Sequence, residues 1–242
     1  MTPVRLSRLA WPKVPERPLV LVPVGSLEQH GPHLPLDTDA TIATAVAEGV
    51  AARLPALGGA LVAPAIGYAA SGEHQSFPGT ISIGDQALRL VLVELVRSLS
   101  TWSGRVVFVN GHGGNVRSLS AAVSRLRHEQ HQVTWVGCDT GDGDGHAGFT
   151  ETSLMLHLTP DRVNMARAAP GNIAPLEELL PVLVVDGVRA VSPSGVLGDP
   201  TAATAEAGRR VLQTMIEDAC DKIEHGEPGA DGRLRVARAG RR

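Results

Sequence analysis

Short apolar runs occur at four places in the chain: residues 19–24 (LVLVPV), 60–66 (ALVAPAI), 105–109 (RVVFV) and 132–136 (QVTWV). Each run has the length of one strand. Consecutive apolar positions, without a regular polar alternation, are typical of strands that are buried on both faces of a sheet. We therefore predict four strands in the interior of one sheet.

Other segments have the spacing of amphipathic helices, with apolar residues three and four positions apart. These segments are 41–54, 86–98, 116–128 and 202–219, and Thr201 or Thr204 is the expected N-cap of the last helix. Alternating strands and helices imply βαβ units, so we predict a single-domain three-layer α/β/α fold with a mostly parallel sheet. Functional groups of such sheets gather in the loops beyond the carboxyl ends of the strands.

Composition supports one domain, because 43% of the 242 residues are hydrophobic and only 19% are charged. We expect this domain at residues 19–224, between an N-terminal arm at 1–18 and a flexible basic tail at 225–242. The arm lacks the apolar run of a signal peptide, and no segment reaches membrane-spanning length. Cys138 and Cys220 lie far apart and indicate no disulfide framework. We therefore expect a cytoplasmic protein.

The charge balance narrows the class of partner. A formal net charge of -3 and a pI near 6.3 provide no basic surface for nucleic acid or for an anionic membrane. Small molecules or peptides are therefore the expected substrates.

The loop after the first predicted strand, GSLEQHGPHLPLDTD at residues 25–39, combines carboxylates and imidazoles with Gly and Pro. Glu28 and His30 are two positions apart, so in an extended segment they project to the same side. Asp39 follows where the chain enters the next helix. Its two oxygens would suit a carboxylate that bridges two metal ions.

Two further loops carry similar residues. The third predicted strand ends in VNGHGGN, where His112 is a candidate ligand and Gly113 and Gly114 are candidates for contacting a substrate oxyanion through their N–H groups. The fourth is followed by GDGDGHAGFTETS, which contains His146 and Glu151. A mixed nitrogen and oxygen donor set without thiolates suits Zn, Mn or Fe. For any one histidine, packing or loop capping is the alternative interpretation.

At these residues the chain resembles the creatininase family of amidohydrolases. The family's E-x-H-G-x-H-x-P-x-x-T-D motif matches at Glu28, His30 and Asp39, and its N-G-H motif matches at His112. The resemblance implies that these residues bind two divalent metal ions per subunit, that His146 is the catalytic histidine, and that subunits assemble as a homo-oligomer, commonly a hexamer. His74, in the segment EHQSFPGTISIG, is expected to line the substrate pocket.

The segments GYAASGEHQSFPGTISIG, HAGFTETSLMLHL and GVLGDPTAATAEAGRR are most similar to a peptidase branch of this family. That similarity implies removal of a C-terminal Val-Tyr dipeptide from a small, ribosomally made precursor peptide that is already enzymatically modified. The alternatives are an amidohydrolase for a small cyclic amide or a formylamino compound, and a metal-stabilised binding protein without turnover.

One position departs from creatininase itself. A glutamate two residues after the N-G-H histidine binds the second metal there, whereas this chain has Gly114. Creatinine hydrolysis is therefore doubtful. Glu151 is our candidate for the missing ligand, because an ionised carboxylate has only acceptor atoms and can therefore bind a cation. The alternative for Glu151 is a carboxylate that merely complements a helix N-terminus.

Overall fold

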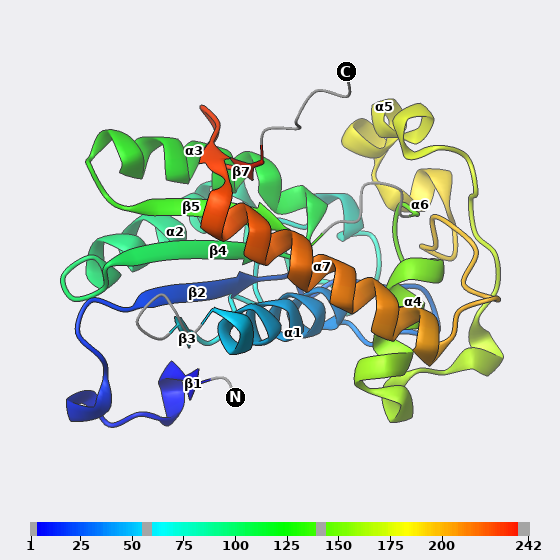
Figure 1. The fold of residues 1–242 in the computed structure, drawn as a ribbon. Coiled ribbons are helices and arrows are strands. Elements are labelled where there is room, and N and C mark those ends of the chain that lie inside the picture. Colours follow the sequence, from blue (N-terminus) through cyan, green and yellow to red (C-terminus); the bar gives the residue numbers. More distant parts are fainter. Residues whose placement is uncertain (1–3, 55–59, 139–143, 237–242) are drawn as a thin grey trace, which may run out of the picture.

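The protein is built on one five-stranded parallel sheet (Figure 1). The structure, a computed structural model, describes residues 4–54, 60–138 and 144–236. Every neighbouring pair of strands in this sheet is parallel, with Val20 opposite Val106 in the central pair. This confirms the α/β class. In spatial order the strands are β1 (Val4–Arg5), β3 (Ala60–Val62), β2 (Leu19–Val24), β4 (Arg105–Asn110) and β5 (Val133–Gly137).

Helices cover both faces of the sheet, which confirms the three-layer arrangement. Successive side chains of a strand point to opposite faces. Leu19 and Leu21 of β2 pack with one group of helices and Val20 and Val22 pack with the other. The first group contains α1 (Thr38–Arg53), α4 (Phe149–Leu158) and α7 (Ala205–His225), and the second contains α2 (Gly84–Leu99) and α3 (Val116–His128).

Local signals in the sequence locate some of the element boundaries, whereas the helix predicted at 202–219 spans Ala205–His225 in the structure. Strand β2 and helix α3 have the predicted limits, and the Thr204 hydroxyl accepts a hydrogen bond from the Ala207 N–H at the start of α7. The predicted strand at 60–66 is wrong beyond Val62, because Pro64 has no N–H for a strand ladder. After Val62 the chain rejoins the sheet only at a single bridge between Ile66 and Val24.

The two ends differ from the prediction. Within the predicted arm, β1 pairs with β3 at the edge of the sheet. Within the predicted tail, β6 (Glu227–Pro228) and β7 (Leu234–Arg235) pair with each other, and Leu234 is buried. The Trp135 N–H and indole N–H donate to backbone oxygens of this segment. The expectation of a flexible tail is thus wrong for residues 225–236, while 237–242 lie outside the described residues.

A smaller helical unit lies beyond the carboxyl ends of the strands (Figure 1). It contains α5 (Leu176–Asp186) and α6 (Val188–Val191), which pack around Leu179, Leu183 and Leu197. Six short 3-10 helices complete the described chain: Leu6–Arg8, Trp11–Lys13, Gly72–His74, Gly113–Asn115, Pro160–Arg162 and Met165–Arg167. None of the helices in the described part is both long and apolar enough to cross a membrane.

Candidate metal centre

Four predicted ligands meet where the central strands end. Glu28 and His30 lie on the loop after β2, Asp39 lies in the first turn of α1, and His112 follows β4. Their exposed fractions are 0%, 0%, 1% and 6%. Ionisable side chains are seldom buried this completely unless they are paired with one another or bind metals.

Asp39 reaches this position because the first turn of α1 packs closely against the end of β2. A Cβ atom at Gly25 would lie 2.3 Å from the backbone nitrogen of Ala40, so no other residue fits between the end of β2 and the first turn of α1. The glycine therefore allows α1 to begin directly against the strand end, with Asp39 directed toward Glu28 and His30.

Asn115 connects the loops that surround the centre. Its buried side chain donates to the Gly25 oxygen at 2.9 Å and accepts from the Ala70 N–H at 3.2 Å. Asn110 donates to the oxygen of His112 at 2.7 Å. These bonds satisfy buried backbone groups and hold three strand-end loops in register.

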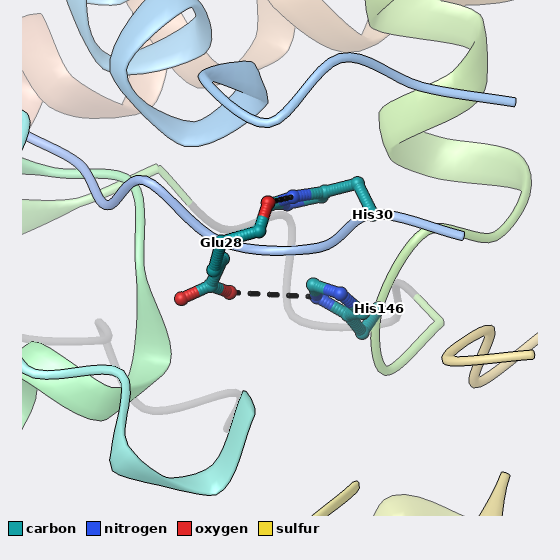
Figure 2. A group of neighbouring side chains, drawn as sticks. All are labelled: Glu28, His30 and His146. Carbon is teal, nitrogen blue, oxygen red and sulfur yellow. Dashed lines mark hydrogen bonds and ion pairs between the residues drawn. The ribbon is translucent and has the colours of Figure 1, made fainter. Parts of the chain in front are cut away.

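The donor atoms form three overlapping groups in which all ligand atoms lie within 4.8 Å of one another. Figure 2 shows the group of Glu28, His30 and His146, in which the carboxylate of Glu28 faces the imidazole of His146. The other two groups share Asp39 and are Glu28, Asp39, His112 and His30, Asp39, Glu151.

Several of these oxygens lack hydrogen-bond partners. Both carboxylate oxygens of Glu28 and Oδ2 of Asp39 are buried with no hydrogen bond from the described residues. His112 Nδ1 lies 3.2 Å from Glu28 Oε1 and 3.3 Å from Asp39 Oδ2, but without hydrogen-bond geometry. An unsatisfied buried polar group costs about 1–3 kcal/mol, and a charged one costs more. The donor set fits divalent cations that accept mixed nitrogen and oxygen ligands.

The charges of the cluster shift its pKa values strongly. Burial opposes ionisation of Glu28, but the neighbouring imidazoles, His112 first, outweigh it and hold the pKa of Glu28 well below its usual range. Burial lowers the pKa of His30, yet Asp39, Glu151 and Glu28 together raise it to about 10. Burial raises the pKa of Asp39 to about 6. The carboxylates of this cluster thus stabilise positively charged groups that lie beside them.

Glu151 lies in the first turn of α4, with Oε2 3.8 Å from His30 Nε2. The same oxygen accepts from the Ala147 N–H at 2.6 Å. Ala147 has a φ of 52°, a left-handed conformation that is costly for a residue with a Cβ, and this hydrogen bond stabilises it. Glu151 therefore both holds the turn after His146 and directs a carboxylate oxygen toward His30.

His146 lines the same site from the other side. Its Nε2 lies 2.8 Å from the backbone oxygen of Gln29, which can only accept, and 3.1 Å from the side-chain amide nitrogen of Gln29, which can only donate. In the tautomer that donates to the closer of these two atoms, the backbone oxygen, Nε2 carries the proton. Nδ1 then has a lone pair, and it lies 3.9 Å from Glu28 Oε1 (Figure 2). Burial lowers the pKa of His146, which keeps the ring neutral.

Comparison with known proteins identifies the family. The family model of creatininase, creatinine amidohydrolase, matches residues 7–223. The chain belongs to the creatininase family. It is therefore a member of a hydrolase family, and the donor clusters above are its candidates for a metal centre.

Individual relatives are more specific. The chain is 55% identical to a mycofactocin precursor peptide peptidase from Mycobacterium ulcerans (strain Agy99), over 90% of this chain and 89% of that protein. It is 29% identical to creatinine amidohydrolase from Pseudomonas putida, over 87% of this chain and 90% of that protein.

Solved structures share the fold. A creatininase structure described as "Creatininase Mn" superposes with a TM-score of 0.77 at 28% identity and covers 92% of this chain and 98% of that one. A mutant creatininase of "Zn-Zn type" gives a TM-score of 0.76, also at 28% identity, and covers 93% and 98%. Creatininase-family structures of this fold are thus described with manganese and with two zinc ions.

Position 114 lacks the glutamate of creatininase, but the structure places another carboxylate beside Gly114 that we did not predict from the sequence. A Cβ atom at Gly114 would lie 2.5 Å from Glu73 Oε1 and 2.4 Å from His112 Nε2. Glu73 Oε1 itself lies 3.3 Å from His112 Nε2. A carboxylate from another loop therefore occupies the space beside Gly114, against the outer nitrogen of a candidate ligand. The sequence indicates this carboxylate only through the position of Glu73 directly before His74.

Four residues of the cluster, Asp39, His112, His146 and Glu151, line a cavity of about 900 Å³. His74, Gly113 and Gly114, predicted to contact substrate, all line it. His74 is also buried against the centre, with Nε2 3.3 Å from Glu28 Oε1, and burial lowers its pKa to about 2. Helix α5 contributes apolar side chains to the lining of the cavity: Leu176, Leu180, Leu183, Val184 and Val185.

Proposed function

We propose that this chain is a metal-dependent peptidase that removes the C-terminal Val-Tyr dipeptide from the modified mycofactocin precursor peptide. The observation that carries the proposal is the buried cluster with unsatisfied carboxylate oxygens beside a peptide-sized cavity, in a chain 55% identical to mycofactocin precursor peptide peptidases. A volume near 900 Å³ is at the upper end of the range usual for ligand sites.

The proposed ligands divide into two sets that share one residue. Glu28, His112 and Asp39 would hold one divalent ion, and His30, Glu151 and Asp39 would hold the other, with Zn, Fe or Mn as candidates. When bound, two such ions lower the pKa of a water molecule toward neutrality and polarise the scissile carbonyl. Glu151 would supply the carboxylate for which Gly114 has no side chain.

His146 is the proposed acid–base residue. With the ring proton on Nε2, Nδ1 carries a lone pair and lies beside the ligand cluster in the cavity, so it can accept a proton from the attacking water. The same nitrogen can then donate that proton to the amide nitrogen as the peptide bond breaks, which leaves a neutral amine. The hydrogen bond from Nε2 to Gln29 orients the ring for both steps.

The cavity wall is suited to the side chains of a peptide. Its α5 side is apolar, and Val and Tyr side chains gain free energy when they leave water for such a surface. Gly113 and Gly114 also line the cavity, where their N–H groups would be available to a substrate oxygen. His74 would keep Glu28 in place beneath the substrate.

Mass spectrometry of the metal-loaded protein with the modified precursor tests this function. The expected result is release of Val-Tyr, and its loss after chelation and in Asp39→Ala. Creatinine and a formylamino compound are the comparison substrates, and turnover of either in place of the peptide would overturn the proposal. Assembly as a homo-oligomer, a hexamer by the family resemblance, is measured separately by sedimentation.

A further inference from the structure

Arg117 is the one Lys or Arg side chain among the described residues that line the cavity. It lies in the first turn of α3, five positions after His112. Carboxylates otherwise dominate the charged part of the lining, which includes Asp39, Glu73, Asp85, Glu151 and Asp186. Away from the proposed metal centre, an anionic group of a substrate is therefore repelled by the carboxylates of this surface and attracted by Arg117.

The guanidinium of Arg117 is available to a ligand. It is exposed, and it makes no hydrogen bond or ion pair within the described ranges. Asp85 is near enough to be affected by its charge, but that carboxylate is already bound by the Ser118 hydroxyl at 2.5 Å and by Arg89 at 2.7 Å. Arg117 thus has no carboxylate of its own in the protein.

We propose that Arg117 binds the terminal carboxylate of the peptide substrate. This inference rests on the proposed function, because it concerns the leaving dipeptide of that reaction. A guanidinium can bind a carboxylate with two parallel hydrogen bonds, which adds orientation to charge attraction. The C-terminus would then lie beside α3, and the remainder of the peptide would extend along the apolar wall of α5.

The spacing in the chain agrees with a dipeptide as the leaving group. From His112 to Arg117 the chain makes one 3-10 turn and enters α3, a rise of roughly 9 Å at about 1.5–2.0 Å per residue. Two extended residues beyond the scissile bond span about 7 Å. The backbone rise from His112 to Arg117 is thus comparable with the length of a dipeptide beyond the scissile bond.

Two precursor peptides that differ only at the C-terminus test the proposal. One ends in a free carboxylate and the other in a carboxamide, and kcat/KM is measured for both. The wild-type protein is expected to prefer the free acid by roughly 10- to 100-fold, the usual effect of a hydrogen bond to a charged group. Arg117→Gln should lose this preference, and Arg117→Lys should retain part of it.

Arg125→Gln is the matched control, since Arg125 lies on the same helix but outside the cavity lining. It should keep the full preference. If Arg117→Gln keeps it too, or if the wild-type protein accepts the amide equally well because an acidic side chain of the peptide is bound instead, the proposal is wrong.

Binding of Val-Tyr and of Val-Tyr amide, measured by calorimetry on the metal-loaded proteins, separates this inference from the proposed function. Arg117-dependent preference for the acid without any turnover would reject the proposed function and keep the carboxylate site. Turnover of the precursor without such preference would do the reverse. Equal binding of both dipeptides together with no turnover would reject both.

Discussion

At the amino ends of the strands, where α2 and α3 end, the carboxylate of Glu129 accepts hydrogen bonds from Arg97 at 2.8 and 3.0 Å and from Arg125 at 2.9 Å. At the carboxyl ends, the oxygens of Glu28 and Oδ2 of Asp39 have no hydrogen-bond partner among the described residues. The Glu129 carboxylate is partly open to water and fully bonded, whereas Glu28 and Asp39 are buried and only Oδ1 of Asp39, which His30 contacts at 2.9 Å, has a hydrogen bond.

This difference separates charges that stabilise the fold from charges that the fold holds for a ligand. The chain surrounds Glu129 with guanidinium groups at its surface, where ionisation costs little. It buries Glu28 and Asp39 at a much higher cost and provides imidazoles at ligand distance instead of Lys or Arg. Without a bound cation, this arrangement lowers the stability of the fold. Such buried and unsatisfied carboxylates are therefore expected at a metal centre.

The largest effect is expected when the residue shared by both donor groups is removed. Asp39→Ala should abolish hydrolysis and reduce bound metal more than the loss of any ligand of a single ion, because Asp39 belongs to both sets. Metal content by mass spectrometry is the measurement. Asp37→Ala is the control, since Asp37 is exposed and pairs with Arg162. Two ions retained in Asp39→Ala would contradict the bridging role.

His146→Ala should lower kcat by roughly 10² to 10⁴ while both metals remain bound, because a single acid–base residue typically contributes this factor. The donor atoms of His146 also lie within reach of Glu28 and His30, so metal content is measured on the same sample. Loss of an ion would make His146 a ligand. An unchanged rate would leave it only a structural role.

Glu151→Gln should weaken one ion selectively. The amide can still accept the Ala147 N–H, but it lacks the charge that holds a divalent cation beside His30. Stepwise removal with a graded series of chelators should therefore release one ion earlier than in the wild-type protein. If both ions leave as they do from the wild type, Glu151 is not a ligand.

Glu73→Gln should reduce metal affinity by roughly 10- to 100-fold, the usual effect of losing a carboxylate that orients a ligand histidine. Because Glu73 acts on His112 and is not itself in the donor groups, excess metal should restore most of the rate. Calorimetric titration of metal into the metal-free protein measures the effect. Wild-type affinity in this variant would show that the contact with His112 is incidental.

The smallest effect is expected at the other end of the sheet. Glu129→Gln should lower Tm by no more than about 3 °C at neutral pH and leave metal binding unchanged. Hydrogen bonds from Arg97 and Arg125 lower the pKa of Glu129 from 4.5 to about 2. Its contribution to stability is thus complete above pH 4.5 and disappears as pH falls toward 2. Thermal unfolding of both proteins over this range should show their Tm values converging.

Local patterns explain how much of the fold and site followed from the sequence. The limits of β2 and α3 depend on a buried apolar run and on helical spacing, and Thr204 caps α7 through its own hydroxyl. Grouping of Glu28, His30, Asp39 and His112 also followed, because loops after parallel strands meet at one edge of a sheet.

Contacts between distant segments required the tertiary structure. Glu73 reaches His112 only because two loops cross beside Gly114, and the availability of Arg117 depends on Asp85 being bound by Ser118 and Arg89. Leu234 is buried, but the segment around it is rich in Gly and Arg and has no apolar periodicity that would predict this burial. The sequence by itself determined the types of the eight predicted strands and helices, the three-layer class and which residues are ligand candidates, since these depend on neighbours in the chain. Packing of one loop against another decided which carboxylate faces which imidazole, because that distance is set by side chains far apart in sequence.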